Sequence, residues 1–157
     1  MAKRKMARRS AESSLARFCQ ALQDLLIQQK IYLAPRLGGA GNRPVGATLV
    51  GWYGVEDDGT RCVYLLTGPC IQEVKAYWSG AGEFFDVPAE VAQRELHEAG
   101  VVIRKDPPQF EARVRVQGVG TPRVLIIDVR KLMSYAEIWL WPEASDEGGD
   151  RAGAEVA

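Results

Sequence analysis

The sequence predicts an α+β fold, a winged helix-turn-helix with an extra N-terminal helix and an additional β-hairpin. The main observation is the stretch 86–129. A helix should begin after Asp86, a capping residue that is followed by Pro88, and should end at Gly100. Two β-rich runs follow, 111–116 and 123–129, joined by a glycine-containing turn. A helix, a short link and a glycine-tipped hairpin are the order of a recognition helix and its wing.

A second observation is an amphipathic helix near the N-terminus. Ser13 or Ser14 can cap it, and it should run to about Ile31 or Tyr32 because Pro35 forbids continuation. Its apolar side chains recur at steps of three and four residues, which predicts a stripe that faces the core. The stripe contains Leu15, Phe18, Cys19, Leu22, Leu25 and Leu26.

Between these two parts the chain predicts a hairpin and a further helix. The runs 48–53 and 61–66 are β-rich and flank the turn 56–59, whose sequence Glu-Asp-Asp-Gly is strong turn chemistry. A helix should follow over 67–78, and the segment 83–85 should turn back and place an aromatic side chain in the core.

The last predicted strand needs a cover on each side. Residues 124–127 (Val-Leu-Ile-Ile) are apolar on both faces, and the helices can meet only one of them. We expect the segment 132–141 to cover the other face. The pattern leaves helix and strand open for this segment, with a short helix favoured by Leu132, Tyr135, Ala136, Trp139 and Leu140.

The charge is unevenly distributed although the net charge is zero. Acidic residues dominate the end of the chain, so we expect a disordered acidic tail at 143–157, one domain at 13–142 and a disordered basic arm at 1–12. The arm can contact nucleic-acid phosphates or simply be solvated. Its basic residues are Lys3, Arg4, Lys5, Arg8 and Arg9.

Several function classes find little support in the sequence. No apolar run approaches the roughly 18 residues that span a bilayer, and Cys19, Cys62 and Cys70 lack C-x-x-C spacing, so we expect a cytoplasmic protein with reduced thiols and no membrane partner. The single histidine, His97, has no neighbouring ligand or nucleophile at motif spacing, so we expect no metal, no cofactor and no catalysis. The loop 36–46 lacks the glycine motif of a phosphate-binding loop. A contact of Arg36 or Arg43 with the DNA backbone is a minority interpretation of this loop.

The helix after Asp86 carries mixed signals for DNA binding. Gln93 and Arg94 have side chains that can bond adenine and guanine in two places, and His97 lies on the same outward side. Glu90, Glu95 and Glu98 argue against this interpretation because they would lie near phosphates. The alternative is that Gln93 and Arg94 only solvate a surface helix, or that Arg94 pairs with Glu90 or Glu98 at four-residue spacing, and the sequence leaves both interpretations open.

The hairpin is more favourable for DNA binding. Arg113 and Arg115 alternate with valines, so both should leave the strand on one face, and Arg104, Lys105 and Arg123 border the same hairpin. These positions predict binding through backbone contacts with modest sequence preference. The alternative is a solvated hairpin face.

A pattern of apolar and turn residues extends over about half of the chain. It consists of Val50–Tyr53, Tyr64–Pro69, Phe85–Pro88, Leu96–Val102 and Arg123–Leu125. In this pattern the sequence resembles the C-terminal winged-helix domain of primase–helicase-type replication ATPases of plasmids, prophages and integrated islands. The resemblance implies a module that helps a replication machine hold DNA or a partner subunit, and it carries no catalytic motif. Because no ATPase is present in this sequence, the chain would stand alone or work in trans beside one.

Together these features predict a non-catalytic DNA-binding protein that acts in replication or maintenance of a mobile genetic element. Its partner would be duplex or single-stranded DNA, with a replication helicase or primase as a further partner. The alternative is a protein–protein interaction module that docks on a replication ATPase or forms a homo-oligomer, since winged helices also serve as docking surfaces.

Overall fold

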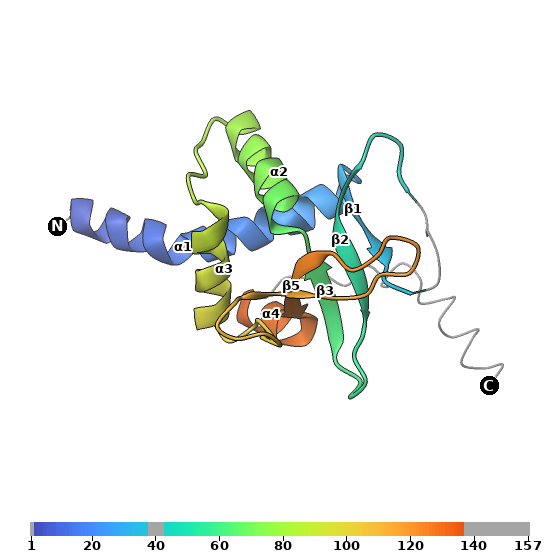
Figure 1. The fold of residues 1–157 in the computed structure, drawn as a ribbon. Coiled ribbons are helices and arrows are strands. Elements are labelled where there is room, and N and C mark those ends of the chain that lie inside the picture. Colours follow the sequence, from blue (N-terminus) through green and yellow to red (C-terminus); the bar gives the residue numbers. More distant parts are fainter. Residues whose placement is uncertain (1, 38–42, 137–157) are drawn as a thin grey trace.

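The computed structural model describes residues 2–37 and 43–136, with side chains described over 14–37 and 43–134 (Figure 1). The described part of the chain forms four helices and five strands, which confirms the predicted α+β class. The elements are α1 (Ala2–Ile27), β1 (Ile31–Pro35), β2 (Thr48–Val55), β3 (Arg61–Leu65), α2 (Thr67–Gly80), α3 (Ala89–Glu98), β4 (Glu111–Arg113), β5 (Arg123–Asp128) and α4 (Val129–Ala136).

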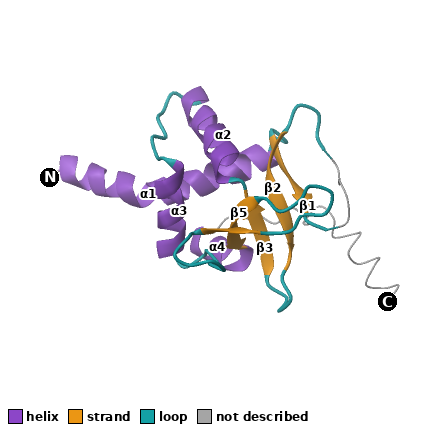
Figure 2. Cartoon of the chain, viewed as in Figure 1, coloured by secondary structure: helices purple, strands orange, loops and turns teal. Residues whose placement is uncertain are grey.

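The strands form one sheet in the order β1-β2-β3-β5-β4 (Figure 2). β1 runs parallel to β2, and all other neighbours are antiparallel. The register between β1 and β2 shifts after Tyr32, so that Leu33 faces Gly51 rather than Val50. A Cβ atom at Gly51 would lie 2.3 Å from the carbonyl oxygen of Tyr64, which explains why glycine occupies this position.

One face of the sheet packs against the helices. The amphipathic stripe of α1 is buried there as predicted, together with α2, α3 and alternate residues of β3 and β5 such as Val63 and Ile127. Phe85, from the segment between α2 and α3, is buried with its ring 6.4 Å from that of Phe18, which confirms the expected aromatic plug. Cys19 and Cys70 fill this core as reduced thiols, and Cys62 is buried in the opposite face.

The opposite face is covered by the β4–β5 hairpin itself. Val114 and Val116 are buried against Trp52 of β2 and Tyr64 of β3, together with the outward residues of β5. The hairpin therefore curls back over the sheet, and its tip lies across β2 (Figure 1). The prediction that 132–141 covers this face is wrong for the described part, because α4 turns to the helix side immediately after β5 and buries Leu132 there. Residues 137–141 lie outside the described part of the chain.

Other boundaries differ from the prediction for local physical reasons. α1 ends at Ile27, not near Tyr32, because Gln29 adopts a left-handed conformation with φ of 59°. The chain then enters β1, a strand that was not predicted from the sequence. Residues 2–12 belong to α1 rather than to a disordered arm. β4 ends at Arg113 instead of continuing to Val116, since the hairpin leaves the sheet at that point.

The helix that was predicted to begin after Asp86 begins later. Pro88 is the residue that precedes the first helical position of α3, and no side chain caps this helix, so Asp86 is not the cap. At the other end, Gly100 has a φ of +82°, which confirms the left-handed stop. The predicted hairpin of β2 and β3 and the predicted helix α2 are confirmed. For 132–141 the sequence left helix and strand open; residues 132–136 belong to helix α4, which begins at Val129 and is described only as far as Ala136.

Candidate nucleic-acid interface

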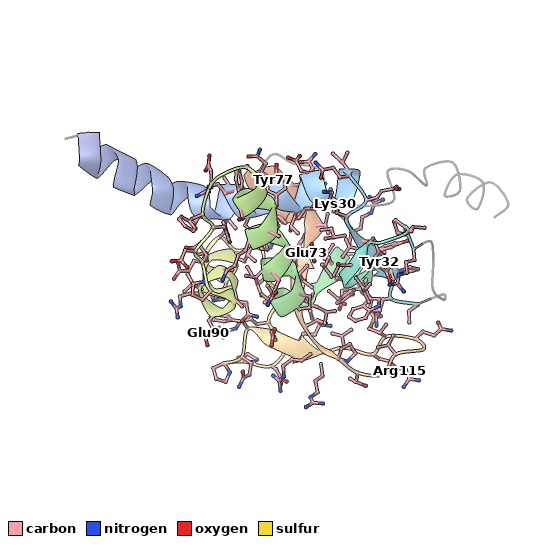
Figure 3. All side chains as sticks on the ribbon, turned by 90° about the horizontal axis from the view of Figure 1, so that it is seen from above. Lys30, Tyr32, Glu73, Tyr77, Glu90 and Arg115 are labelled. Carbon is pink, nitrogen blue, oxygen red and sulfur yellow. The ribbon has the colours of Figure 1, made fainter. Side chains whose placement is uncertain are left out.

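Three arginine side chains leave the β4–β5 hairpin on its solvent side. Arg113 and Arg123 are direct cross-strand partners, and Arg115 follows Arg113 by two residues, so all three share one face. All three are exposed, whereas Val114 and Val124 between them are buried. We call Arg113, Arg115 and Arg123 the arginine face; Arg115 points away from the body of the protein in Figure 3.

The arginine face is unfavourable for the isolated protein. Like charges directly opposite each other on neighbouring strands repel and destabilise a sheet. Within the described part of the chain no acidic side chain forms an ion pair with any of the three guanidinium groups. The predicted alternation of arginine and valine is therefore present, and among the described side chains the three guanidinium groups form a concentrated positive charge without an ion-pair partner.

Helix α3 is less available than the sequence suggested. The Nε2 of Gln93 donates hydrogen bonds to Thr67 Oγ1 at 3.0 Å and to Glu111 Oε2 at 2.8 Å. The His97 ring is half-buried, with its centroid 5.2 Å from that of Phe110. Of the three candidate residues on this helix only Arg94 is exposed, so the structure argues against base reading by Gln93 and His97.

The link between α3 and β4 also uses its basic residues internally. The Arg104 guanidinium lies 5.8 Å from the centroid of the Phe110 ring. The Nζ of Lys105 forms an ion pair with Glu56, at the end of the β2–β3 hairpin. These two side chains stabilise the outer surface of the fold and are only partly free for a ligand.

Glu56 is the acidic centre of this outer surface. It accepts hydrogen bonds from the Tyr64 hydroxyl and from Lys105. Burial raises the pKa of Glu56, but the hydrogen bonds from Lys105 and Tyr64 and the positive charges of Lys105 and Arg36 together outweigh it, so the pKa is lowered from its ordinary value of 4.5. Burial, followed by the bond to Glu56, raises the pKa of the Tyr64 hydroxyl far above its ordinary value of 10.0.

Arg36, which the sequence analysis considered only for a backbone contact, belongs to the same surface. Its guanidinium carbon lies 5.1 Å from the centroid of the Tyr64 ring, and its Nη1 donates to the carbonyl oxygen of Arg115 at 2.9 Å. The two residues are 79 positions apart, so no local pattern could have indicated this contact.

The basic arm is not brought to the arginine face. Its backbone forms the first turns of α1, which project beyond the other helices. In the views of Figures 1 and 3 the N-terminal end of α1 and the tip of the β4–β5 hairpin lie at opposite ends of the molecule. The described side chains begin at Ser14 and do not include those of Lys3, Arg4, Lys5, Arg8 and Arg9.

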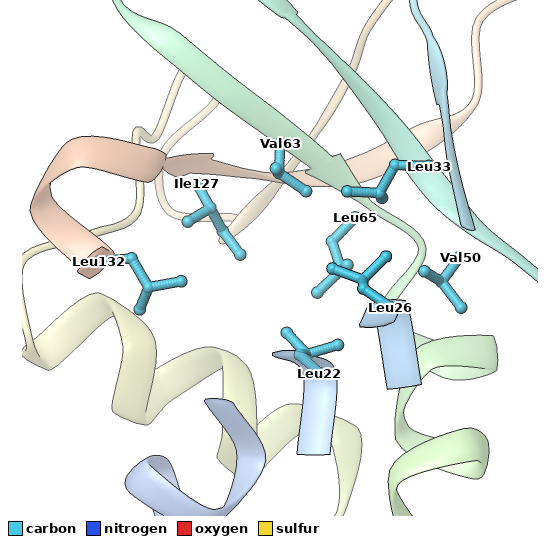
Figure 4. A pocket seen from close by; sticks show the side chains of 8 residues that line it. All are labelled: Leu22, Leu26, Leu33, Val50, Val63, Leu65, Ile127 and Leu132. Carbon is cyan, nitrogen blue, oxygen red and sulfur yellow. The ribbon is translucent and has the colours of Figure 1, made fainter. Parts of the chain in front are cut away.

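Two cavities lined by described residues do not suggest a small-molecule site. An apolar gap of about 10 Å³ between α1, α4 and the sheet (Figure 4) has room for little more than one water molecule. A hollow of about 520 Å³ lies between the β2–β3 turn and α4, but its acids serve local roles: Asp58 accepts bonds from Thr60, and Asp128 accepts one from the Lys131 amide. Among the described residues no three histidine, cysteine or acidic side chains form a metal-binding group.

Comparisons with known proteins and a membrane criterion add little. No family model, curated protein or solved structure matches the chain. The resemblance to replication ATPases of mobile elements therefore stays a prediction. Within the described residues, no helix combines the length and the apolar character required to cross a bilayer.

Proposed function

We propose that this chain is a non-catalytic DNA-binding protein of the winged helix-turn-helix class, acting in the replication or maintenance of a mobile genetic element. The order of the elements supports the fold assignment. α2 and α3 supply the two helices, and β4 and β5 form the wing beside α3. β3, which lies between α1 and α2 in the chain, pairs with β5, and β1 and β2 extend that sheet.

The single observation that carries the proposal is the arginine face. Arg113 and Arg123 lie directly opposite each other, and within the described part of the chain no acidic side chain forms an ion pair with either, so their repulsion costs stability unless a ligand neutralises them. Arginine is the side chain best suited to phosphate, which it can bind through two parallel N–H groups. A strand that presents several arginines at its surface fits a polyanionic backbone.

The same geometry favours modest sequence preference. The side chain of Gln93 is occupied by Thr67 and Glu111, and Glu90 and Glu98 keep the exposed side of α3 acidic. Binding would depend mainly on phosphate contacts from the arginine face, with Arg94 the one exposed candidate for a base contact on α3. The basic residues of the first turns of α1 would form a second, separate phosphate contact.

The experiment is a titration of fluorescent duplex and single-stranded oligonucleotides over a salt series. For duplex DNA, log K should fall with log salt with a slope of about −0.9 for each phosphate neutralised. The variant Arg113→Ala/Arg115→Ala/Arg123→Ala should bind all sequences more weakly. Its salt slope should become shallower by an amount equal to up to about three phosphate contacts.

The matched control removes three charges elsewhere. Lys30, Lys75 and Lys131 are exposed and lie outside the arginine face, so the triple alanine variant at these positions should keep most of the wild-type affinity. Equal loss in the two triple variants would show that only net charge matters. Absence of binding to either form of DNA at low salt would refute the proposal.

A protein–protein interaction module is the second candidate, favoured by one exposed aromatic residue. Phe84, between α2 and α3, is 88% exposed beside the buried Phe85, and an exposed phenylalanine is a typical anchor of a protein interface. A replication ATPase or a second copy of this chain would cover it. Light scattering after size-exclusion chromatography, with wild type and Phe84→Ser, tests self-association, and the same variant tests co-elution with a replication ATPase.

A further inference from the structure

Arg36 holds the tip of the β4–β5 hairpin against the far side of the sheet. It follows β1, which lies at the opposite edge of the sheet from β4. Its Nη1 donates to the carbonyl oxygen of Arg115 at 2.9 Å, and its own carbonyl oxygen accepts from the Gln117 amide at 3.0 Å. Arg36 thus bonds to two positions of the hairpin, through its side chain to Arg115 and through its backbone to Gln117.

The Arg36 side chain is closely packed. It lies over the Tyr64 ring and next to Gly54, where a Cβ would be in ordinary van der Waals contact, 3.4 Å, with both Arg36 Cβ and the Tyr64 ring. The Nε of Arg36 is buried without a hydrogen-bond partner among the described residues. These contacts indicate that the Arg36 guanidinium serves to bind Arg115 and to pack on Tyr64, and not to bind a ligand.

The hairpin tip needs such a hold because it has left the sheet. β4 ends at Arg113, and beyond it the backbone bonds run within the hairpin, from the Val114 amide to Pro122 and from the Val116 amide to Gly120. Arg115 therefore lies on a segment that is bonded to the other arm of the hairpin but to no strand of the sheet. Its position relative to the sheet depends on the buried valines and on Arg36.

We infer that Arg36 is a positioning residue for DNA binding: it fixes the hairpin so that the arginine face is preformed. The inference rests on the proposed function. A preformed face avoids the entropy cost of ordering the hairpin when DNA binds. Arg36 acts through the hairpin and itself makes no contact with the phosphates.

Hydrogen exchange and DNA affinity of Arg36→Ala and Arg36→Lys test the inference. Lysine keeps the charge but lacks the planar group that lies over Tyr64 and the directed N–H donors. In both variants the Gln117 and Gly120 amides should exchange roughly tenfold faster or more, as expected when the hydrogen bond of a charged donor is lost. Affinity for duplex DNA should fall roughly fivefold, the cost of ordering mobile side chains on binding.

The control is Arg43→Ala, which removes an exposed positive charge whose guanidinium lies 5.9 Å from the Tyr32 ring centroid, away from the hairpin contacts. Its hairpin amides should exchange as in the wild type. Amides of α2 and β3 serve as an internal reference in every variant, because a merely structural role of Arg36 would accelerate them as much as those of the hairpin.

Each outcome decides. Faster exchange confined to the hairpin, with weaker binding by both Arg36 variants, supports the inference. Unchanged hairpin exchange overturns it, and so does acceleration of all amides alike. Wild-type DNA affinity in Arg36→Lys together with a loss of DNA affinity in Arg36→Ala would show that Arg36 contributes through its charge alone, which overturns the inference. If the wild type binds no DNA, the proposed function fails, while the exchange data still decide whether Arg36 holds the hairpin.

Discussion

Reversing the charge of Arg123 should strengthen the fold and weaken DNA binding at the same time. Arg123 lies directly opposite Arg113 in the β4–β5 register, and both side chains are exposed. Cβ atoms of such partners lie about 5 Å apart, so Arg123→Glu replaces a repulsive pair by an attractive one. Because exposed pairs are screened by water, we expect the free energy of unfolding to rise by only about 0.5 kcal/mol.

The effect on DNA is in the opposite direction and larger. If Arg123 contacts a phosphate as proposed, the substitution removes that contact, and it places a carboxylate beside Arg113. We expect the salt slope to lose about one phosphate contact or more and the low-salt affinity for duplex DNA to fall roughly tenfold. A typical destabilising mutation lowers both stability and binding, so opposite signs are specific to a binding surface that is strained by its own charge.

Urea unfolding followed by circular dichroism, at low and at high salt, measures the first effect. The gain should shrink at high salt, and Arg123→Gln, which ends the repulsion without creating an attraction, should lie between wild type and Arg123→Glu. Lys75→Glu is the matched reversal on α2 and should leave DNA affinity nearly unchanged. A loss of stability in Arg123→Glu at low salt, or a gain independent of salt, would refute the electrostatic reasoning.

Three further predictions test other parts of the structure. Gln93→Ala should lower the free energy of unfolding by about 1–2 kcal/mol, because it leaves the buried hydroxyl of Thr67 without this partner, and it should bind DNA as the wild type does. Gly51→Ala should cost about 2–3 kcal/mol in urea unfolding, since its Cβ would lie 2.3 Å from the Tyr64 carbonyl oxygen. Burial raises the pKa of the Cys19 thiol from 9.0 to about 12, so its contribution to stability is complete below pH 9 and is lost as pH rises toward 12, where only the unfolded thiol ionises readily. The urea midpoint should therefore fall above pH 9, and less so in Cys19→Ala.

The fold could be predicted from the sequence wherever a local pattern determined it. The stripe of α1, the turn of the β2–β3 hairpin and the stop at Gly100 all follow from residue spacing or backbone chemistry, and each is confirmed. β1 was missed because Ile31–Pro35 continues the apolar pattern of the helix, while the force that extends it is pairing with β2, which lies beyond a loop. Local patterns do not contain that partner.

The candidate site was predictable in part for the same reason. The alternation of arginines and valines indicated the arginine face, but the direct opposition of Arg113 and Arg123 depends on the register across the turn. The side chain of Gln93 reads as free in the sequence, and only the packing of α3 beside Thr67 and Glu111 shows that it is occupied. Arg36 was invisible as a hairpin contact because its partner lies 79 residues away.

One alternating strand of the hairpin supplies both a packing face and the proposed DNA-binding face. Its valines seal the outer face of the sheet, and its arginines point to solvent, so the residues that stabilise the fold and those that would bind DNA are adjacent but separable. Substitution of Val114 or Val116 should therefore affect both stability and binding, while substitution of an arginine should affect binding alone or improve stability. In a hairpin that projected freely, as a wing does when it only follows a DNA backbone, the valines would contribute little to stability. Because Val116 is only 2% exposed and Arg36 bonds to Arg115, this hairpin is packed into the core, and the fold sets the geometry of the arginine face before any ligand could bind.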